Sequence, residues 1–372
     1  MKSLQQIFQD AFASIDITIN GDKPWDIQVH NPKLYDRIVS EGNLGFGEAY
    51  MEGWWDCEAL DEFLFKVLND RLHSKLPIRN LGFLFFVLKA KFKNLQTKSW
   101  SKEVAFKHYD LGNELFEKIL DKQMMYSCGY WKTATNPDDA QEAKLDLICR
   151  KLKLEKGMTL LDIGCGWGGL SRYAAEKYGV TVTGITLSEE QAVFAREVNK
   201  GLAVDIRVID YRDLHEKFDR IAAVAVTEHI GYRNYRKFME MANENLTKDG
   251  IFLIHTIGGN HDAKNTEPWI DKYIFPNGMV PSASQLSKAW QGLFILEDWH
   301  NFGPDYDPTL MAWIHNLEEN WDSIKADYDE SFCRMWRYYL CGSAASFRSR
   351  HNQLWQIVLT KRVHLGIYES VR

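Results

Sequence analysis

The chain has 372 residues, which is enough for two domains and a full-sized apolar core. Its formal net charge of −6, with 26% charged and 45% hydrophobic residues, argues against a nucleic-acid-binding protein. The six cysteines show no CxxC pair and no metal-binding spacing, so we expect free thiols in a reducing compartment and no bound metal. Residues 1–21 lack the apolar stretch of a signal peptide, and the apolar run at 81–88 is too short to span a bilayer, so a cytoplasmic protein is expected.

The N-terminal part is predicted to form a smaller domain over residues 1–75, with a helix from Asp61 onward. A basic linker at 76–104 follows. From Arg71 to Lys102 the chain has eight Lys or Arg residues and no Asp or Glu, and its apolar residues recur at helical spacing. Two interpretations stay open. The segment is either a solvated helix that packs on its own domain or a basic amphipathic surface that meets an anionic membrane.

The part from 105 to 372 is predicted to be a second domain in which strands and helices alternate. The predicted strands are 158–163, 180–186, 204–209, 218–226 and 250–257, with two last strands within 293–302 and 354–362. One helix is expected to end at Gly179, and Ser188 and Gln191 are spaced as a capping box for the next. This alternation implies an α/β, doubly wound, mostly parallel sheet, whose ligands bind beyond the carboxyl ends of its strands.

A glycine-rich turn follows the first of these strands, in "LLDIGCGWGGL" at 160–170. Glycines let a backbone approach a ligand closely. The pattern D-x-G-x-G-x-G departs from the dinucleotide-binding spacing and resembles the S-adenosylmethionine loop of class I methyltransferases. A nucleotide site or a purely structural turn is the alternative. No acidic residue follows the second strand to hold a ribose, so Thr186 or Gln191 is expected to make that polar contact.

Two titratable residues stand at the ends of neighbouring strands. Glu228 follows the fourth strand in "VTEHIG", and His255 closes the fifth in "LIHTIGG". In this topology the first, fourth and fifth strands are neighbours, so both side chains should open on one crevice beside the glycine loop. His255 as an ordinary core histidine is the alternative. The segment 300–313 is expected to be a loop whose Tyr306 lies over the site. The stretch "MMYSCGYW" at 124–131 is either plain core or the wall of an apolar pocket.

Together these motifs resemble the bacterial cyclopropane-fatty-acyl-phospholipid synthases. The resemblance is carried by "HYDLGN", "YSCGYW", "LDIGCGWGG", "GITLS", "EHIG", "HTIGG", "KYIFPNG", "EDWHNFG" and "TLMAW", and "LGFGEAYMEGWWDC" is similar to the family's N-terminal domain. It implies a seven-stranded class I methyltransferase sheet with lipid-binding insertions and a lipid-associated N-terminal domain. The implied reaction transfers the methyl group of S-adenosylmethionine to a cis double bond of a phospholipid acyl chain. The resulting cation then loses a proton and closes to a cyclopropane.

The resemblance also implies site residues, with S-adenosylmethionine and bicarbonate as cofactors. The implied cofactor contacts are Tyr126, Ser127, Asp162, Gly164, Cys165, Gly166, Gly168, Thr186, Leu187, Ser188, Gln191, Tyr211 and Arg212. The implied bicarbonate site, which would supply the base, consists of Cys128, Glu228, His255, Ile257 and Tyr306. "MMYSCGYW" would then face the cofactor and the reacting centre and also make room for an acyl chain. The expected partners are an unsaturated phospholipid, an anionic surface at the inner face of the membrane and a second copy of the chain, with no nucleic acid.

One position departs from the family pattern. Members often carry a cysteine in a late "YYL…F" segment, but here Ser343 occupies that position and Cys341 stands two residues earlier. A shift of two residues turns a helical side chain to another face, so we expect the chemistry to need no thiol there. Two other functions stay open: a lipid or amine methyltransferase of the same superfamily that closes no ring, and a non-catalytic lipid-binding protein.

Overall fold

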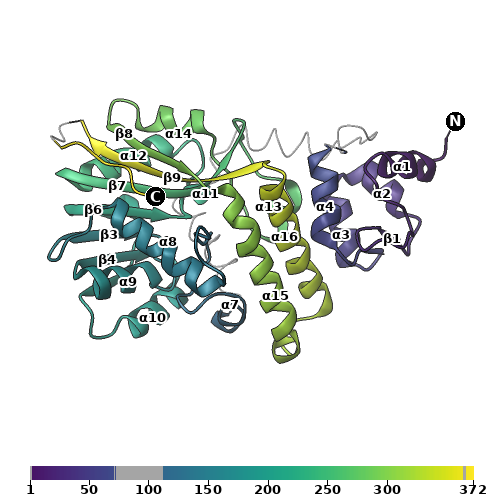
Figure 1. The fold of residues 1–372 in the computed structure, drawn as a ribbon, viewed down its shortest axis with the longest axis horizontal. Coiled ribbons are helices and arrows are strands. Elements are labelled where there is room, and N and C mark those ends of the chain that lie inside the picture. The colour runs from purple at the N-terminus through teal and green to yellow at the C-terminus, as the bar shows by residue number, and fades with distance from the viewer. Residues whose placement is uncertain (1, 71, 73–111, 363–365) are drawn as a thin grey trace. The chain divides into compact units, whose positions relative to one another are not determined.

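A computed structural model describes residues 2–70, 72, 112–362 and 366–372 of the chain (Figure 1). The predicted basic linker at 76–104 therefore lies outside the described residues. The chain divides into two compact units, each described by itself below. The N-terminal unit comprises Met1–Lys93, Asn265–Pro276 and Leu310–Asn352, and the sheet unit comprises Asn94–Lys264, Asn277–Thr309 and Gln353–Arg372. Within the described ranges, no helix is both long and apolar enough to cross a membrane.

The sheet unit is built on one seven-stranded sheet, as predicted. In chain order its strands are β3 (Thr159–Ile163), β4 (Thr181–Thr186), β5 (Val204–Val208), β6 (Phe218–Val224), β7 (Leu246–Gly259), β8 (Phe294–Asn301) and β9 (Asn352–Lys361). They lie in the order β5-β4-β3-β6-β7-β9-β8, with β3 to β7 joined in parallel and β8 antiparallel to β9. The predicted adjacency of the first, fourth and fifth strands is confirmed, since β6 lies between β3 and β7.

Helices cover both faces of this sheet, because side chains of a strand point alternately to its two faces. Leu253 of β7 belongs to a core with Ile148 of α8 (Pro137–Lys151), whereas its neighbour Phe252 belongs to a second core with Phe238 of α12 (Tyr235–Asn245). The helices and 3₁₀ turns of this unit are α7 (Asn113–Ile119), α8 (Pro137–Lys151), α9 (Gly169–Tyr178), α10 (Glu189–Val198), η2 (Tyr211–Asp213), α11 (Thr227–Ile230), α12 (Tyr235–Asn245), α14 (Ala283–Trp290) and η3 (Gly303–Asp305).

The N-terminal unit is mainly helical and draws on three parts of the chain. Its elements are α1 (Leu4–Ala13), β1 (Gln28–Val29), α2 (Leu34–Glu41), α3 (Asn43–Met51), β2 (Trp55–Asp56), α4 (Leu60–Asn69), α13 (Pro268–Tyr273), most of α15 (Tyr306–Ile324) and α16 (Glu330–Arg348). The buried Trp55 ring stacks on Phe46 at 4.3 Å. The Arg334 guanidinium on α16 donates to the Tyr50 carbonyl at 2.6 Å and so ties α16 to α3.

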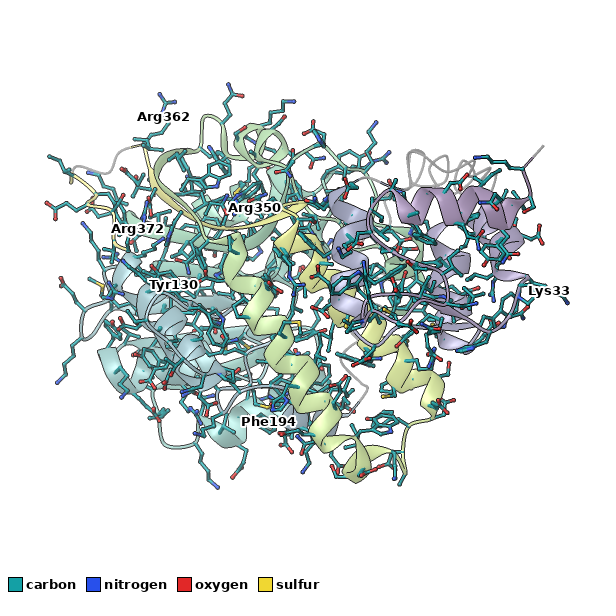
Figure 2. All side chains as sticks on the ribbon, turned by 45° about the vertical axis from the view of Figure 1, so that its right-hand side comes forward. Lys33, Tyr130, Phe194, Arg350, Arg362 and Arg372 are labelled. Atoms are coloured by element: carbon teal, nitrogen blue, oxygen red, sulfur yellow. The ribbon has the colours of Figure 1, made fainter. Side chains whose placement is uncertain are left out.

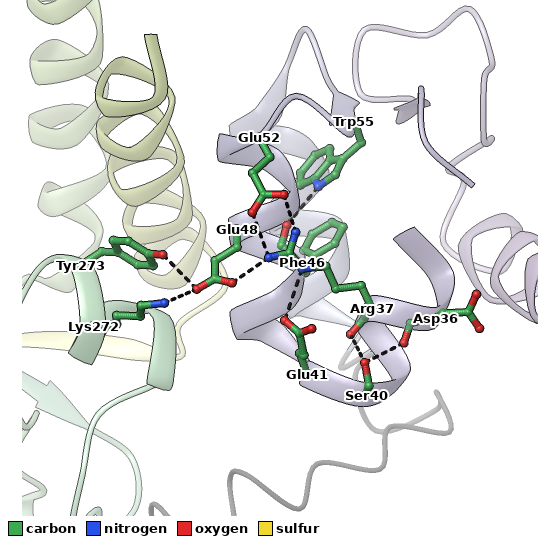
Figure 3. A network of polar contacts seen from close by, with 10 residues as sticks. All are labelled: Asp36, Arg37, Ser40, Glu41, Phe46, Glu48, Glu52, Trp55, Lys272 and Tyr273. Carbon is green, nitrogen blue, oxygen red and sulfur yellow. Dashed lines mark hydrogen bonds and ion pairs between the residues drawn. The ribbon is translucent and has the colours of Figure 1, made fainter. Parts of the chain in front are cut away.

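A polar network fixes α13 to the N-terminal helices inside this unit (Figure 3). Arg37 on α2 donates to Glu48 and Glu52, each at 2.8 Å. The other oxygen of Glu48 accepts from Lys272 at 2.6 Å and from the Tyr273 hydroxyl at 2.9 Å. One carboxylate on α3 therefore joins α2 to the "KYIFPNG" segment, more than 200 residues later in the chain.

Two local predictions need correction. The expected loop at 300–313 is wrong, because a helix begins at Tyr306. Pro308 favoured the interpretation as a loop. Proline is nevertheless tolerated in the first turn of a helix, where N–H groups have no helical partner. The apolar positions Leu310, Trp313, Ile314 and Leu317 are buried at helical spacing.

The capping box at the start of α10 forms only in part. The Ser188 hydroxyl oxygen accepts the N–H of Gln191 at 3.2 Å, as predicted. The reciprocal bond is missing, because the Gln191 carboxamide oxygen accepts instead from the Thr186 hydroxyl at 2.9 Å. The predicted end of α9 at Gly179 is confirmed, with that glycine in the left-handed conformation at φ 65°.

Candidate active site

The glycines of the turn after β3 differ in their surroundings: two pack against other residues, and one borders open space. Gly164, Gly166 and Gly168 all have positive φ. A Cβ atom would lie 2.5 Å from Val226 at Gly164 and 2.5 Å from Asn199 at Gly168, so both positions are filled by the protein itself. At Gly166 no atom of the other described residues lies within 4 Å of such a Cβ, apart from its chain neighbours. Gly166 therefore borders space that a ligand can use.

Asp162 and Cys165, at the start of this turn, are both buried. Asp162 accepts the Ser171 hydroxyl of α9 at 2.8 Å, and burial raises the pKa of its carboxyl to about 6. The backbone N–H groups of Gly164 and Cys165 donate to the Ile185 carbonyl of β4 at 2.8 and 3.0 Å. These contacts hold the turn against the neighbouring strand.

The polar residues after β4 bind one another. The Thr186 hydroxyl donates to Gln191, and the Ser188 N–H donates back to the Thr186 oxygen at 3.2 Å, across Leu187. The Gln191 carboxamide keeps its NH₂ group, which meets no acceptor among the described residues. This NH₂ group can therefore donate a hydrogen bond to a ligand, in the region where a ribose contact is expected.

A third polar group follows β5. The Arg212 guanidinium pairs with Asp210, with its Nε 2.7 Å from the carboxylate. The Tyr211 ring meets Phe238 edge-on at 5.3 Å, and burial raises the pKa of its hydroxyl to about 12, so that hydroxyl stays neutral. Asp210 is buried and was not predicted; an acidic residue just past the end of a strand is its only signal in the sequence.

Aromatic contacts join the stretch 124–131 to the glycine turn. The Tyr126 ring lies 5.4 Å from that of Phe116 on α7, which lies 4.8 Å from the Trp167 ring in the turn. The Trp167 indole N–H donates to Asn113 at 2.8 Å. This stretch is therefore both part of a core and a neighbour of the turn.

The start of α15 is bound to the same stretch. The Thr309 hydroxyl oxygen accepts the Gly129 N–H at 3.1 Å and the Trp131 indole N–H at 2.8 Å, and Asp305 accepts the Trp131 backbone N–H at 2.7 Å. The structure thus brings the buried Tyr306 and the buried Cys128 onto adjoining segments. Burial raises the pKa of the Cys128 thiol well above its usual range, so the thiol is neutral.

The ring of Tyr130, labelled in Figure 2, lies 5.3 Å from that of Phe302. Phe302 in turn meets the His255 ring at 5.9 Å. A line of aromatic rings therefore runs from the stretch 124–131 to His255, four residues before the end of β7.

Glu228 is held at the end of β6 by the neighbouring strand. Its Oε1 accepts the Ile257 backbone N–H at 2.7 Å, and Oε2 accepts the Thr227 hydroxyl at 3.3 Å. Burial raises the pKa of this carboxyl, while these hydrogen bonds oppose the shift. The structure thus brings Glu228 and Ile257 together. The Glu228 carboxyl takes up a proton more readily than that of an exposed glutamate.

His255 lies nearby without touching Glu228. Only 1% of the residue is exposed, and its Nδ1 lies 3.3 Å from the Gln356 amide nitrogen. Its Nε2 is buried and has no hydrogen-bond partner within the described part of the chain. Burial lowers the pKa of the imidazole far below its usual range, so the ring is neutral. No hydrogen bond joins His255 to Glu228 in the described residues: Glu228 binds the backbone of Ile257, and His255 faces Gln356.

A buried lysine completes the site and was missed. Lys144 on α8 donates to the Ser127 hydroxyl oxygen at 2.9 Å. Gln141, one turn earlier, donates to the Ser127 carbonyl at 2.7 Å. The only sequence signal was a lysine among the apolar positions of a helix.

Comparison with known proteins identifies the family. The family model described as mycolic acid cyclopropane synthetase matches residues 96–357. The chain is 48% identical over 362 residues to the cyclopropane-fatty-acyl-phospholipid synthase of Escherichia coli (strain K12), covering 97% of this chain and 94% of that protein.

Two solved structures share the fold. The cyclopropane synthase MmaA2 from Mycobacterium tuberculosis has a TM-score of 0.67 at 31% identity, covering 72% of this chain and all of that one. The mycolic acid cyclopropane synthase CmaA1, complexed with SAH and CTAB, has a TM-score of 0.66 at 32% identity, covering 70% and 98%. The chain therefore belongs to the mycolic acid cyclopropane synthetase family and is an S-adenosylmethionine-dependent methyltransferase.

Proposed function

We propose that this enzyme transfers a methylene group from S-adenosylmethionine across the cis double bond of an unsaturated acyl chain in a membrane phospholipid, forming a cyclopropane fatty acid. The observation that carries this proposal is the 48% identity, over nearly the whole chain, to the E. coli protein that bears the name of this activity. The site described above supports the same reaction.

The described residues fit S-adenosylmethionine. The open space at Gly166 allows the close approach that a bound nucleoside needs. The Gln191 NH₂ group and the Ser127 O–H group are hydrogen-bond donors without an acceptor among the described residues. CmaA1, one of the two solved structures reported above, was solved with SAH, the demethylated form of that cofactor. When bound, the cofactor supplies an electrophilic methyl group. Because an alkene is a poor nucleophile, the protein's contribution is to hold the two in line.

The residues also fit a small anion such as bicarbonate. The buried Nε2 of His255 has no hydrogen-bond partner among the described residues, and the raised pKa of Glu228 favours a protonated carboxyl that can donate a hydrogen bond to an anion. The neutral Cys128 thiol adds no competing charge. Bicarbonate held there would act as an oriented base. Since Glu228 would share a proton with it, any pKa measured there belongs to the group as a whole.

The late cysteine segment supports a reaction without a thiol nucleophile. Cys341 is buried in α16, and burial raises the pKa of its thiol to about 12. Nucleophilic cysteines need a lowered pKa, because the thiolate is the reactive form. Cys341 and Ser343 therefore stay outside the proposed catalytic set.

The product decides between ring closure and simple methylation. We expect unsaturated phospholipid vesicles, incubated with the enzyme and S-adenosylmethionine, to yield acyl chains heavier by one CH₂ group and without the double bond. Mass analysis of the released acyl chains, before and after ozonolysis, checks both changes. Acyl chains that gain mass but keep an alkene would point to the superfamily's ring-free methylation. Modified amine head groups would point to amine methylation.

We further propose that the enzyme docks on the inner face of an anionic membrane through the basic segment 71–102, and that it works as a homodimer. Lysines near an anionic surface contribute on the order of 1 kcal/mol each, and salt weakens this attraction. Replacing Lys89, Lys91 and Lys93 by Gln should therefore reduce co-sedimentation with anionic vesicles at low salt. The control replaces three exposed lysines of the sheet unit, which changes the charge equally: Lys156, Lys177 and Lys200. Equal losses in the two triple variants would rule out the segment as the docking surface.

A further inference from the structure

Lys144 is an unusual residue for the interior of this fold. Its side chain is fully buried, with 0% exposed, on the face of α8 that meets the stretch 121–128. Lysines are almost never fully buried unless they are paired. Here the ammonium donates to the Ser127 hydroxyl oxygen at 2.9 Å, and it is close enough to the carboxylates of Asp121 and Asp162 for both to act on it. Because burial removes this charge from water, we expect Lys144 to have a role beyond packing.

The contact with Lys144 determines which way Ser127 presents its hydrogen. A serine hydroxyl has one O–H donor and two acceptor lone pairs. Lys144 takes an acceptor position on the oxygen, while Gln141 fixes the Ser127 carbonyl at 2.7 Å. Among the described residues none accepts the Ser127 O–H. Its hydrogen is therefore left to donate to a ligand.

The stretch that carries Ser127 is itself rigidly supported. The Asp121 carboxylate accepts the N–H groups of Gln123 at 2.8 Å and of Met125 at 3.0 Å. A Cβ atom on Gly169, at the start of α9, would lie 2.3 Å from the Gln123 carbonyl oxygen, so the stretch packs directly against the helix that follows the glycine turn. Ser127 therefore has a fixed position beside the turn that borders the open space at Gly166.

We propose that Lys144 is a positioning residue that orients the Ser127 hydroxyl to donate to the carboxylate of the methionine part of S-adenosylmethionine. This inference rests on the proposed function. A carboxylate is the strongest acceptor on that molecule for an O–H donor, and a cation hydrogen-bonded behind the hydroxyl polarises it further. Lys144 acts through Ser127 and touches no reacting atom.

The orientation depends on the proton of Lys144. Burial lowers the pKa of this amine to about 8, although three neighbouring groups oppose the shift: Asp121, Cys128 and Asp162. His255 of β7 also feels its charge. Below pH 8 the ammonium can only donate, so the Ser127 hydrogen points to the ligand. Above pH 8 the neutral amine can accept that hydrogen instead. Affinity for a carboxylate-bearing ligand should therefore fall as the pH rises through about 8.

Two nucleosides separate this role from a structural one. S-adenosylhomocysteine carries the carboxylate, whereas 5′-methylthioadenosine shares the adenosine and the sulfur but lacks it. We expect Lys144→Met and Ser127→Ala each to weaken S-adenosylhomocysteine binding roughly tenfold or more, as for a hydrogen bond to a charged group. Binding of 5′-methylthioadenosine should be unchanged. Lys144→Arg, which keeps a donor, should recover part of the loss. Calorimetric titration of the full chain with both nucleosides, at pH 7 and pH 9, measures each affinity.

Lys151→Met is the matched control. Lys151 lies on the same helix, is equally buried, and has its pKa lowered to about 8 by burial, but it pairs with Asp298 at 3.3 Å. The Lys151→Met variant should leave the ratio of the affinity for S-adenosylhomocysteine to that for 5′-methylthioadenosine unchanged. The inference is overturned if Lys144→Met weakens both nucleosides equally or weakens neither. Should Lys144→Met show no cooperative thermal unfolding, Ser127→Ala decides by the same criterion. A parent enzyme that binds no S-adenosylhomocysteine overturns the proposed function, and this inference with it.

Discussion

Glu228→Gln is expected to lose between about 100-fold and 10,000-fold in turnover while it still binds S-adenosylhomocysteine, the range that positioned acid–base groups contribute. The substitution keeps the shape of the side chain, and the amide oxygen can still accept the Ile257 N–H that now reaches the carboxylate at 2.7 Å. An amide, however, can neither take up nor share a proton at a site where burial raises the pKa of the carboxyl. Steady-state turnover and calorimetric titration measure the two quantities separately.

The bicarbonate proposal adds a second measurement on the same pair of proteins. In carbonate-free buffer the parent should lose turnover and regain it when bicarbonate is added, whereas the Glu228→Gln variant should not respond. Glu267→Gln is the matched control, because burial also raises the pKa of that carboxyl and its oxygen accepts the N–H groups of Trp269 and Ile270. It should keep turnover close to that of the parent. Parent-like turnover in Glu228→Gln would remove Glu228 from the reaction.

Repeating patterns made the sheet predictable. Short apolar runs separated by amphipathic helices, with glycines at the turns, located all seven strands to within a few residues at most ends, apart from the extra residues at the start of β7. Parallel strands then placed Glu228 and His255 at the same edge of adjacent strands, which needs no knowledge of side-chain packing. The register pairs Val224 with His255 and confirms this placement.

Features that depend on three-dimensional packing could not be predicted from the sequence. The burial of Lys144 contradicts the rule that charged residues lie on the solvent side of a helix, and its partners, the Ser127 hydroxyl and the carboxylates of Asp121 and Asp162, come together only in the folded chain. The proline at the third position of α15 is typical of loops, so the start of this helix was not recognised. Likewise, Glu228 and His255 share an edge but not a hydrogen bond, because Glu228 binds the backbone of Ile257 and His255 faces Gln356.

The second large effect concerns the glycine turn. Gly166→Val should lower the affinity for S-adenosylhomocysteine by on the order of 100-fold or more, equivalent to about 2.7 kcal/mol. The physical reason is exclusion of the ligand rather than collision with the protein, since within the described ranges no atom beyond the chain neighbours lies within 4 Å of a Cβ at this position. Calorimetric titration of the variant measures the loss, and a thermal unfolding scan confirms that it is folded.

Gly201→Val controls for backbone strain in this experiment. Gly201 also has a positive φ, at 87° against 55° for Gly166, and a Cβ there would likewise meet no atom of the other described residues within 4 Å. A β-branched residue forced to positive φ costs of order 1–3 kcal/mol at either position, so both variants should lose thermal stability to a similar degree. Only Gly166→Val should lose the ligand, because Gly201 lies in the turn after α10 and not in the glycine turn after β3. If Gly166→Val binds S-adenosylhomocysteine as tightly as Gly201→Val does, the open space at Gly166 is not where the cofactor lies, and the assignment of the glycine turn to S-adenosylmethionine fails.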